Sequence, residues 1–156
     1  MFVDASALTA MLTDEREARE LLARAQKYPI RFTSPLAVWE TAIAVARALG
    51  IDVRDAASAV EDFLVLTEIE VRPVTAEVRR LALEAFDLFG KGRHPAALNF
   101  GDCFAYACAR FAGAPLLYKG DDFPVLQCLW PDKKGRFPTD SGFAKALRPR
   151  QPLLDL

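Results

Sequence analysis

The chain lacks several of the motifs that commonly mark an active site. It has one histidine, His94, and neither a G-x-S-x-G motif nor a glycine-rich phosphate loop, so neither a serine triad nor a P-loop is indicated. Its three cysteines are odd in number and have no C-x-x-C spacing, which argues against a disulfide framework or a zinc knuckle. Cys103 and Cys108 are expected to be small buried residues of one helix.

Long apolar runs and a basic body are also missing. Even the apolar stretch Leu36–Ala46 is short and contains Glu40, so no membrane contact is expected. The chain enters Phe2-Val3 without a basic region or signal peptide, which predicts a cytoplasmic protein. The net charge is −1: residues 131–156 carry six Lys/Arg and three Asp, or +3, which leaves −4 for residues 1–130. The body is therefore not a basic nucleic-acid-binding surface.

Short apolar segments alternate with helical patterns along a chain of 156 residues, of which 52% are apolar. Strands are expected at 2–3, 30–33, 70–73 and 115–118, and helices at 6–12, 15–26, 34–49, 54–66, 75–89 and 99–113. This alternation predicts an α/β domain with a mostly parallel sheet. Residues 126–156 are basic and rich in proline, and they are expected to form an irregular tail.

Three carboxylates, Asp4, Glu40 and Asp102, stand in stretches otherwise suited to burial, with no cationic residue beside them. Burying an ionised carboxylate is costly, and mutual repulsion adds to that cost, so a bound divalent cation is the simplest remedy. Asp4 and the pair Asp121-Asp122 each follow an expected strand, at the edge of a parallel sheet where ligands bind. Glu40 and Asp102 lie near the starts of helices that return to this edge.

Carboxylate oxygens are ligands that Mg²⁺ and Mn²⁺ prefer, and such an ion activates water and stabilises charge on a phosphodiester. Each residue also has a purely structural interpretation. Asp4 fits a helix cap, Asp102 fits the first turn of a helix, and Glu40 fits a polar stripe on a helix surface. Asp121 and Asp122 fit an ordinary turn. The prediction of a metal-binding acidic pocket depends on the joint arrangement.

Four segments together resemble PIN-domain ribonucleases of the VapC type, the toxins of bacterial toxin–antitoxin modules. They are Phe2–Leu8, Trp39-Glu40, Gly101–Ala109 and Leu116–Phe123, in the family's order. The resemblance covers residues 1–125 and implies a PIN-like three-layer α/β/α domain. It also implies Mg²⁺- or Mn²⁺-dependent endoribonuclease activity that leaves 5′-phosphate and 3′-hydroxyl ends, and inhibition by a small antitoxin.

The resemblance also implies roles for individual residues. Asp4 and Asp102 match the principal metal ligands, Glu40 completes the first site, and Ser6 matches a hydroxyl residue that orients the first Asp or a bound water. The chain departs from the family at Gly120, which stands where many relatives have an Asp. Asp122, which precedes Phe123, is the favoured fourth carboxylate, and Asp121 remains possible.

A cationic group near the acidic motifs is expected to contact RNA phosphates: Lys91, Arg93, His94 and Lys119. A solvated loop is the alternative for the first three. The expected partners are the RNA substrate, a cognate antitoxin and a second copy of the chain. Two other functions remain open. One is a phosphatase-like enzyme with an aspartate nucleophile, and the other is a non-catalytic RNA- or partner-binding module.

Overall fold

The computed structural model describes residues 1–119, in which four short strands form one parallel sheet. The strands are β1 (Phe2–Val3), β2 (Arg31–Thr33), β3 (Ile69–Val71) and β4 (Leu116–Leu117). Their order is β3-β2-β1-β4, and every neighbouring pair is parallel. The sheet is therefore built from β1 outward to β2 and β3 on one side, and the last strand, β4, is added on the other side of β1. In such sheets a crevice forms at the carboxyl ends of the strands, at this change of direction.

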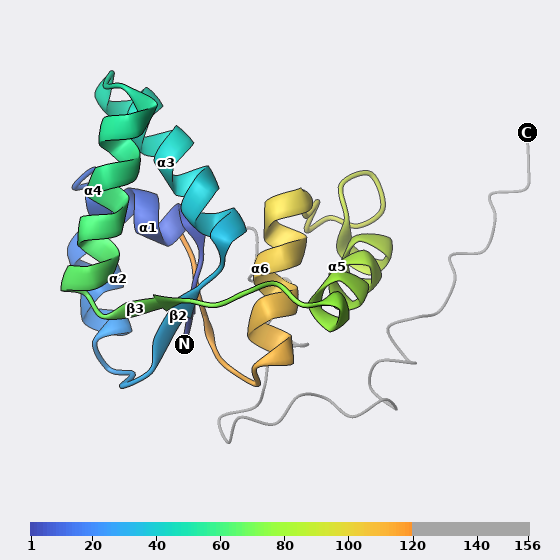
Figure 1. Cartoon of the computed structure of the whole chain (residues 1–156). Coiled ribbons are helices and arrows are strands. Elements are labelled where there is room, and N and C mark those ends of the chain that lie inside the picture. Colours follow the sequence, from blue (N-terminus) through green and yellow to red (C-terminus); the bar gives the residue numbers. More distant parts are fainter. Residues whose placement is uncertain (120–156) are drawn as a thin grey trace, which may run out of the picture.

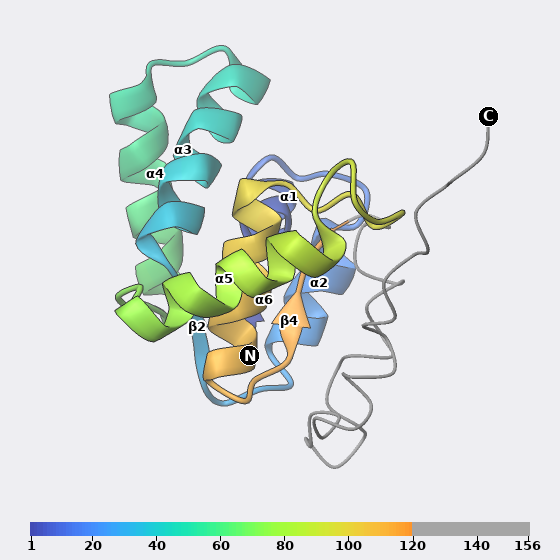
Figure 2. The same ribbon diagram turned by 90° about the vertical axis from the view of Figure 1, so that its right-hand side faces the viewer.

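Six helices cover the sheet within the described residues (Figure 1). They are α1 (Ala5–Leu12), α2 (Ala18–Ala25), α3 (Pro35–Leu49), α4 (Val53–Leu66), α5 (Ala76–Phe89) and α6 (Phe100–Phe111). Helices α1 to α4 lie on one side of the sheet and α5 and α6 on the other, as Figure 2 shows from the α5 side. The expected α/β architecture is confirmed, with helices in two layers around the sheet.

Alternation along the strands divides the core between the two faces of the sheet. Phe2 and Leu116 belong to a buried cluster formed mainly with α5 and α6. Val3 and Leu117, the next residue of each strand, belong to a second cluster with α1, α2 and α4. Successive side chains of a strand point to opposite faces, so two residues suffice to join both layers. Although β1 and β4 are short, packing on both faces therefore holds them in place, together with the residues that follow them.

Local signals account for the ends of α3. The Ser34 side chain accepts a hydrogen bond from the Ala37 N–H at 3.2 Å, and Pro35 occupies the first turn. Gly50 ends the helix with φ 66°, a left-handed conformation that glycine adopts without strain. The helix expected at 15–26 is shorter, because α2 begins only at Ala18 and Glu15 lies in the turn before it. Local pattern did not reveal this turn.

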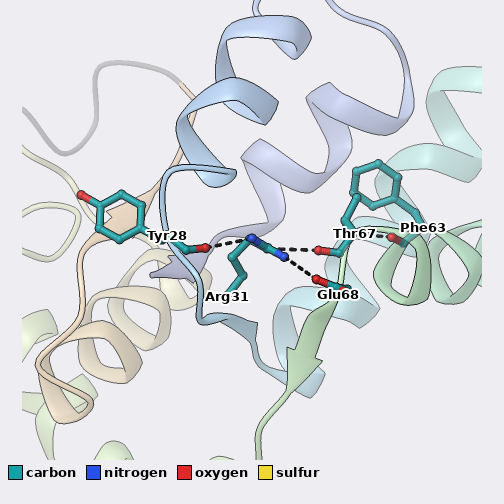
Figure 3. A network of polar contacts seen from close by, with 5 residues as sticks. All are labelled: Tyr28, Arg31, Phe63, Thr67 and Glu68. Atoms are coloured by element: carbon teal, nitrogen blue, oxygen red, sulfur yellow. Dashed lines mark hydrogen bonds and ion pairs between the residues drawn. The ribbon is translucent and has the colours of Figure 1, made fainter.

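Arg31 ties the start of β2 to the turn between α4 and β3 (Figure 3). Its guanidinium group donates hydrogen bonds to the carbonyl oxygens of Tyr28 at 2.8 Å and Thr67 at 3.1 Å, and it forms an ion pair with Glu68 at 3.1 Å. The five donors of a guanidinium group permit such a three-way contact. The network holds β3 beside β2 at the amino edge of the sheet, opposite the edge that carries the candidate site.

Both cysteines within the described residues, Cys103 and Cys108, are free thiols buried in α6, as expected. Burial raises the pKa of each thiol to about 11, and the charge of Asp102 contributes to the shift at Cys103. A protonated thiol is a poor nucleophile, so neither is suited to nucleophilic catalysis. Among residues 1–119 no helix is both long enough and apolar enough to cross a bilayer.

Candidate active site

Asp4 lies directly after the central strand β1 and is buried, with 6% of its surface exposed. Its backbone N–H donates to the Leu117 carbonyl oxygen at 2.9 Å, which continues the pairing of β1 with β4. Its side chain is the N-cap of α1: Oδ2 accepts the Ser6 N–H at 3.0 Å and the Ser6 hydroxyl at 2.5 Å. The cap and the buried strand hold this carboxylate in one position at the carboxyl edge of the sheet.

Asp102 stands in the first turn of α6 and takes part in a reciprocal capping box with Asn99. The Asn99 N–H donates to Asp102 Oδ2 at 2.8 Å, and the Asp102 N–H donates to Asn99 Oδ1 at 3.1 Å. These bonds satisfy two backbone donors at the helix end. The structural roles considered for Asp4 and Asp102 are therefore both present, and neither excludes a role in a site.

Glu40 projects from α3 toward the first turn of α6. It lines a small cavity of about 10 Å³ together with Asp4, Ser34 and Gly101. Glu40 is partly exposed on α3 and Asp102 is half-buried, so Asp4 is the most deeply buried of the three carboxylates.

Gly101 allows the close approach of α3 and α6. A Cβ atom at this position would lie 2.6 Å from Glu40 Oε2 and 3.3 Å from Asn99 Oδ1. Real Cβ atoms do not come within 2.6 Å of an oxygen, so any larger residue would displace the Glu40 carboxylate. The absence of a side chain at Gly101 is thus a requirement for the position of Glu40.

Electrostatic repulsion links the three carboxylates. The pKa of Glu40 is raised above its usual value, chiefly by partial burial and then by the charges of Asp4 and Asp102. Within residues 1–119, however, no three acidic, histidine or cysteine side chains converge closely enough to form a ready-made metal cage. The donors fit Mg²⁺ or Mn²⁺ in their chemistry, since both ions take carboxylate oxygens and keep several waters. An ion bound here would need adjustment of a side chain or a further ligand.

A family model for the PIN domain matches residues 1–127 of the chain. The chain belongs to the PIN-domain family. It is 37% identical over 123 residues to Ribonuclease VapC30 of Mycobacterium tuberculosis, covering 79% of this chain and 92% of that protein. It is 38% identical over 123 residues to Ribonuclease VapC of Mycolicibacterium smegmatis, covering 79% of this chain and 93% of that protein.

A solved PIN-domain structure agrees with these relatives. The crystal structure of Mycobacterium tuberculosis VapC20, a sarcin-ricin loop cleaving toxin, superposes with a TM-score of 0.64 at 26% identity. The match covers 81% of this chain and 94% of VapC20. The resemblance to VapC-type PIN domains and the PIN-like fold that it implied are therefore confirmed.

The fourth acidic position of the PIN site remains a prediction, because Asp121 and Asp122 lie outside the described residues. The irregular tail expected at 126–156 also lies outside the described residues. One position that matters to the geometry of the site, Gly101, was not identified from the sequence. It had a usable signal, since glycine is unfavourable inside a helix and its presence there often marks a close approach.

The candidate RNA-contacting residues of this PIN domain differ in their surroundings. Lys91 is exposed in the loop before α6. Arg93 forms an ion pair with Asp87 at 2.8 Å.

The side chains of His94 and Lys119 each contact another residue of the domain. His94 packs its ring edge-on against Phe89, and its Nδ1 accepts the Ala96 N–H at 3.1 Å. The Lys119 ammonium forms an ion pair with Glu15. Lys91 therefore has the fewest competing contacts of the four candidates, and RNA contact by any of them stays a prediction.

Replacing Glu40 with glutamine is expected to raise the melting temperature of the metal-free PIN domain at neutral pH. A carboxyl group whose pKa is raised by folding destabilises the fold as pH rises from its usual value of 4.5 through the raised value. The gain in the variant should thus be smallest below pH 4.5 and grow above it. Thermal melts in EDTA across this range measure the gain.

The control for this prediction is Glu61→Gln, which changes an exposed glutamate of α4 outside the site. It should show no comparable rise. A gain in Glu40→Gln that is independent of pH would contradict the assignment of repulsion to the Glu40 carboxylate.

Proposed function

We propose that the protein is a metal-dependent endoribonuclease and the toxin of a toxin–antitoxin module. The observation that supports this most strongly is the placement of Asp4 and Glu40 around one cavity at the carboxyl edge of a PIN-domain sheet, with Asp102 near enough to help raise the pKa of Glu40. The curated relatives are named VapC ribonucleases, which supports RNA as the substrate. Mg²⁺ or Mn²⁺ is the proposed cofactor.

The residues of the proposed site have different roles. Asp4 and Asp102 are held by hydrogen bonds at helix starts and serve as fixed ligands, while Glu40 is exposed and able to adjust. Ser6 orients the Asp4 carboxylate. When bound, the ion supplies a lowered pKa for water and stabilises charge on the phosphodiester. Asp122, or alternatively Asp121, is the proposed fourth carboxylate.

The proposal also includes partners. A VapC-type toxin implies a cognate antitoxin, whose binding would cover the acidic edge. A homodimer and a cytoplasmic location, where RNA and antitoxin are found, complete the proposal. The toxin should be recovered together with the antitoxin when the two genes are co-expressed.

The phosphatase-like alternative is less well supported. It requires an aspartate nucleophile and usually a Lys or Ser/Thr near the phosphate, and Lys119 is the lysine that could fit. Its ammonium group is paired with Glu15, and Glu40 has no role in that chemistry. A covalent aspartyl-phosphate trapped from the protein would favour this alternative.

Incubation of the purified protein with total RNA tests the proposed function. We expect cleavage with Mg²⁺ or Mn²⁺, complete loss with EDTA, and recovery on adding excess metal, since the bound ion is what lowers the pKa of the attacking water. The new ends should be 5′-phosphates and 3′-hydroxyls, as end-specific ligation can show. Intact RNA under all metal conditions, or cleavage that EDTA leaves unchanged, would refute the proposal.

A further inference from the structure

A continuous chain of polar contacts runs from the Asp4 carboxylate to Glu15. The Ser6 hydroxyl donates to Asp4 Oδ2 at 2.5 Å and accepts the Lys119 backbone N–H at 3.0 Å. The ammonium group of the same lysine forms an ion pair with Glu15 in the turn between α1 and α2. Three segments of the chain therefore meet beside Asp4, at the carboxyl ends of β1 and β4 where the direction of the sheet changes.

The Ser6 hydroxyl has only one proton to donate. It gives this proton to Asp4, and so the orientation of the hydroxyl depends on a donor that occupies its lone pair. The Lys119 N–H is that donor. If the backbone at Lys119 moves, the hydroxyl loses its second contact and is held only by its bond to Asp4. The position of the chain after β4 thus controls a contact of the buried carboxylate.

The ion pair between Lys119 and Glu15 fixes that position. Their side chains are 35% and 34% exposed, so solvent screens the attraction and the pair adds little to global stability. Its effect is local, because it joins the residue just beyond β4 to the segment between α1 and α2. Because this ion pair adds little to the free energy of unfolding, its main consequence is to fix the relative position of the two segments.

We propose that Glu15 is a positioning residue for the metal site. Through Lys119 it holds the chain after β4 against Ser6, and thereby orients the Asp4 carboxylate. The inference rests on the proposed function and assigns Lys119 to site geometry.

The test is Glu15→Gln, with Mn²⁺ affinity measured by calorimetry beside RNA cleavage kinetics. We expect Mn²⁺ affinity to fall about tenfold, as for other residues that support a metal ligand. kcat should fall with it, whereas KM for RNA and the melting temperature in EDTA should stay at wild-type values. The control is Glu70→Gln, which removes the same charge from the exposed ion pair with Arg72 and should change none of these quantities.

Two further variants test whether Glu15 acts through Lys119 and Ser6. The charge swap Glu15→Lys with Lys119→Glu should restore most of the Mn²⁺ affinity, because it rebuilds the pair. In a Ser6→Ala background, Glu15→Gln should cause no additional loss, since the contact it supports is already absent. Failure of the swap, or an undiminished loss without Ser6, would overturn the inference.

The results also separate this inference from the proposed function. Wild-type Mn²⁺ affinity in Glu15→Gln, or a change confined to KM, would overturn the positioning role while RNA cleavage by the wild-type protein stood. Weakened Mn²⁺ binding in Glu15→Gln, in a protein that cuts no RNA, would support the positioning role and refute the ribonuclease.

Discussion

Asp4→Asn is expected to lower RNA cleavage at least about a hundredfold and to abolish Mn²⁺ binding, while the protein stays folded. Asparagine is nearly the same size as aspartate and is an equally good helix N-cap, so the bond from the Ser6 N–H to residue 4 persists. The lost charge is what a divalent cation requires. Its removal also relieves repulsion on Glu40, so the melting temperature in EDTA should equal or exceed that of the wild type.

The matched control for this prediction is Asp52→Asn. Asp52 is the exposed N-cap of α4, where its side chain accepts the Arg54 N–H at 2.8 Å, and it is remote from the cavity. The two variants make the same chemical change at the same kind of helix position. Cleavage kinetics and calorimetry should separate them, and wild-type cleavage by Asp4→Asn would remove Asp4 from the metal site.

Most of the fold could be predicted from sequence because its signals are local. Ser34-Pro35 and Gly50 mark the two ends of α3, and each does so through a contact within a few residues. The strands were predictable for another reason: short apolar segments between helices leave few arrangements other than a parallel sheet. Thr75 shows the limit of such signals, since it occupies the N-cap position of α5 without a side-chain capping bond.

The site was less predictable, because its geometry depends on segments far apart in the chain. Sequence predicted one pocket for Asp4, Glu40 and Asp102. The cavity is lined by Asp4 and Glu40, and the charge of Asp102 contributes to the raised pKa of Glu40. Sequence left open whether Glu40 lies on the surface of α3, where the structure places it. It did not show that Lys119 pairs with Glu15, which precedes it by 104 positions. No local pattern encodes a contact at that separation.

Asp4 and Asp102 lie at helix starts, where the local structure stabilises a negative charge, and Glu40 does not. Asp4 caps α1 and Asp102 lies in the capping box of α6, where backbone N–H groups and the helix dipole favour a negative charge. Glu40 lies inside α3 and has no such support. The pKa of Glu40 is raised, chiefly by partial burial and then by the charges of Asp4 and Asp102. Helix starts hold the rigid part of the site, and the adjustable ligand comes from a helix interior.

Gly101→Ala should separate the position of Glu40 from the stability of the fold. The added Cβ would lie 2.6 Å from Glu40 Oε2, and the end of that flexible side chain can swing away at little cost. Alanine also favours a helix over glycine by up to about 1 kcal/mol, which offsets the crowding. We therefore expect a melting temperature in EDTA close to wild type, with Mn²⁺ affinity and kcat each reduced about tenfold or more.

A double-mutant cycle shows whether Gly101→Ala acts through Glu40. With Glu40→Ala already present, the space that the new Cβ needs is empty, so Gly101→Ala should cause no further loss of Mn²⁺ affinity. A full additional loss would mean that the methyl group acts instead on the Asn99 side chain, whose Oδ1 lies 3.3 Å from the same Cβ position. That result would assign Gly101 to the capping box of α6 and leave the approach of Glu40 to the site without a structural requirement.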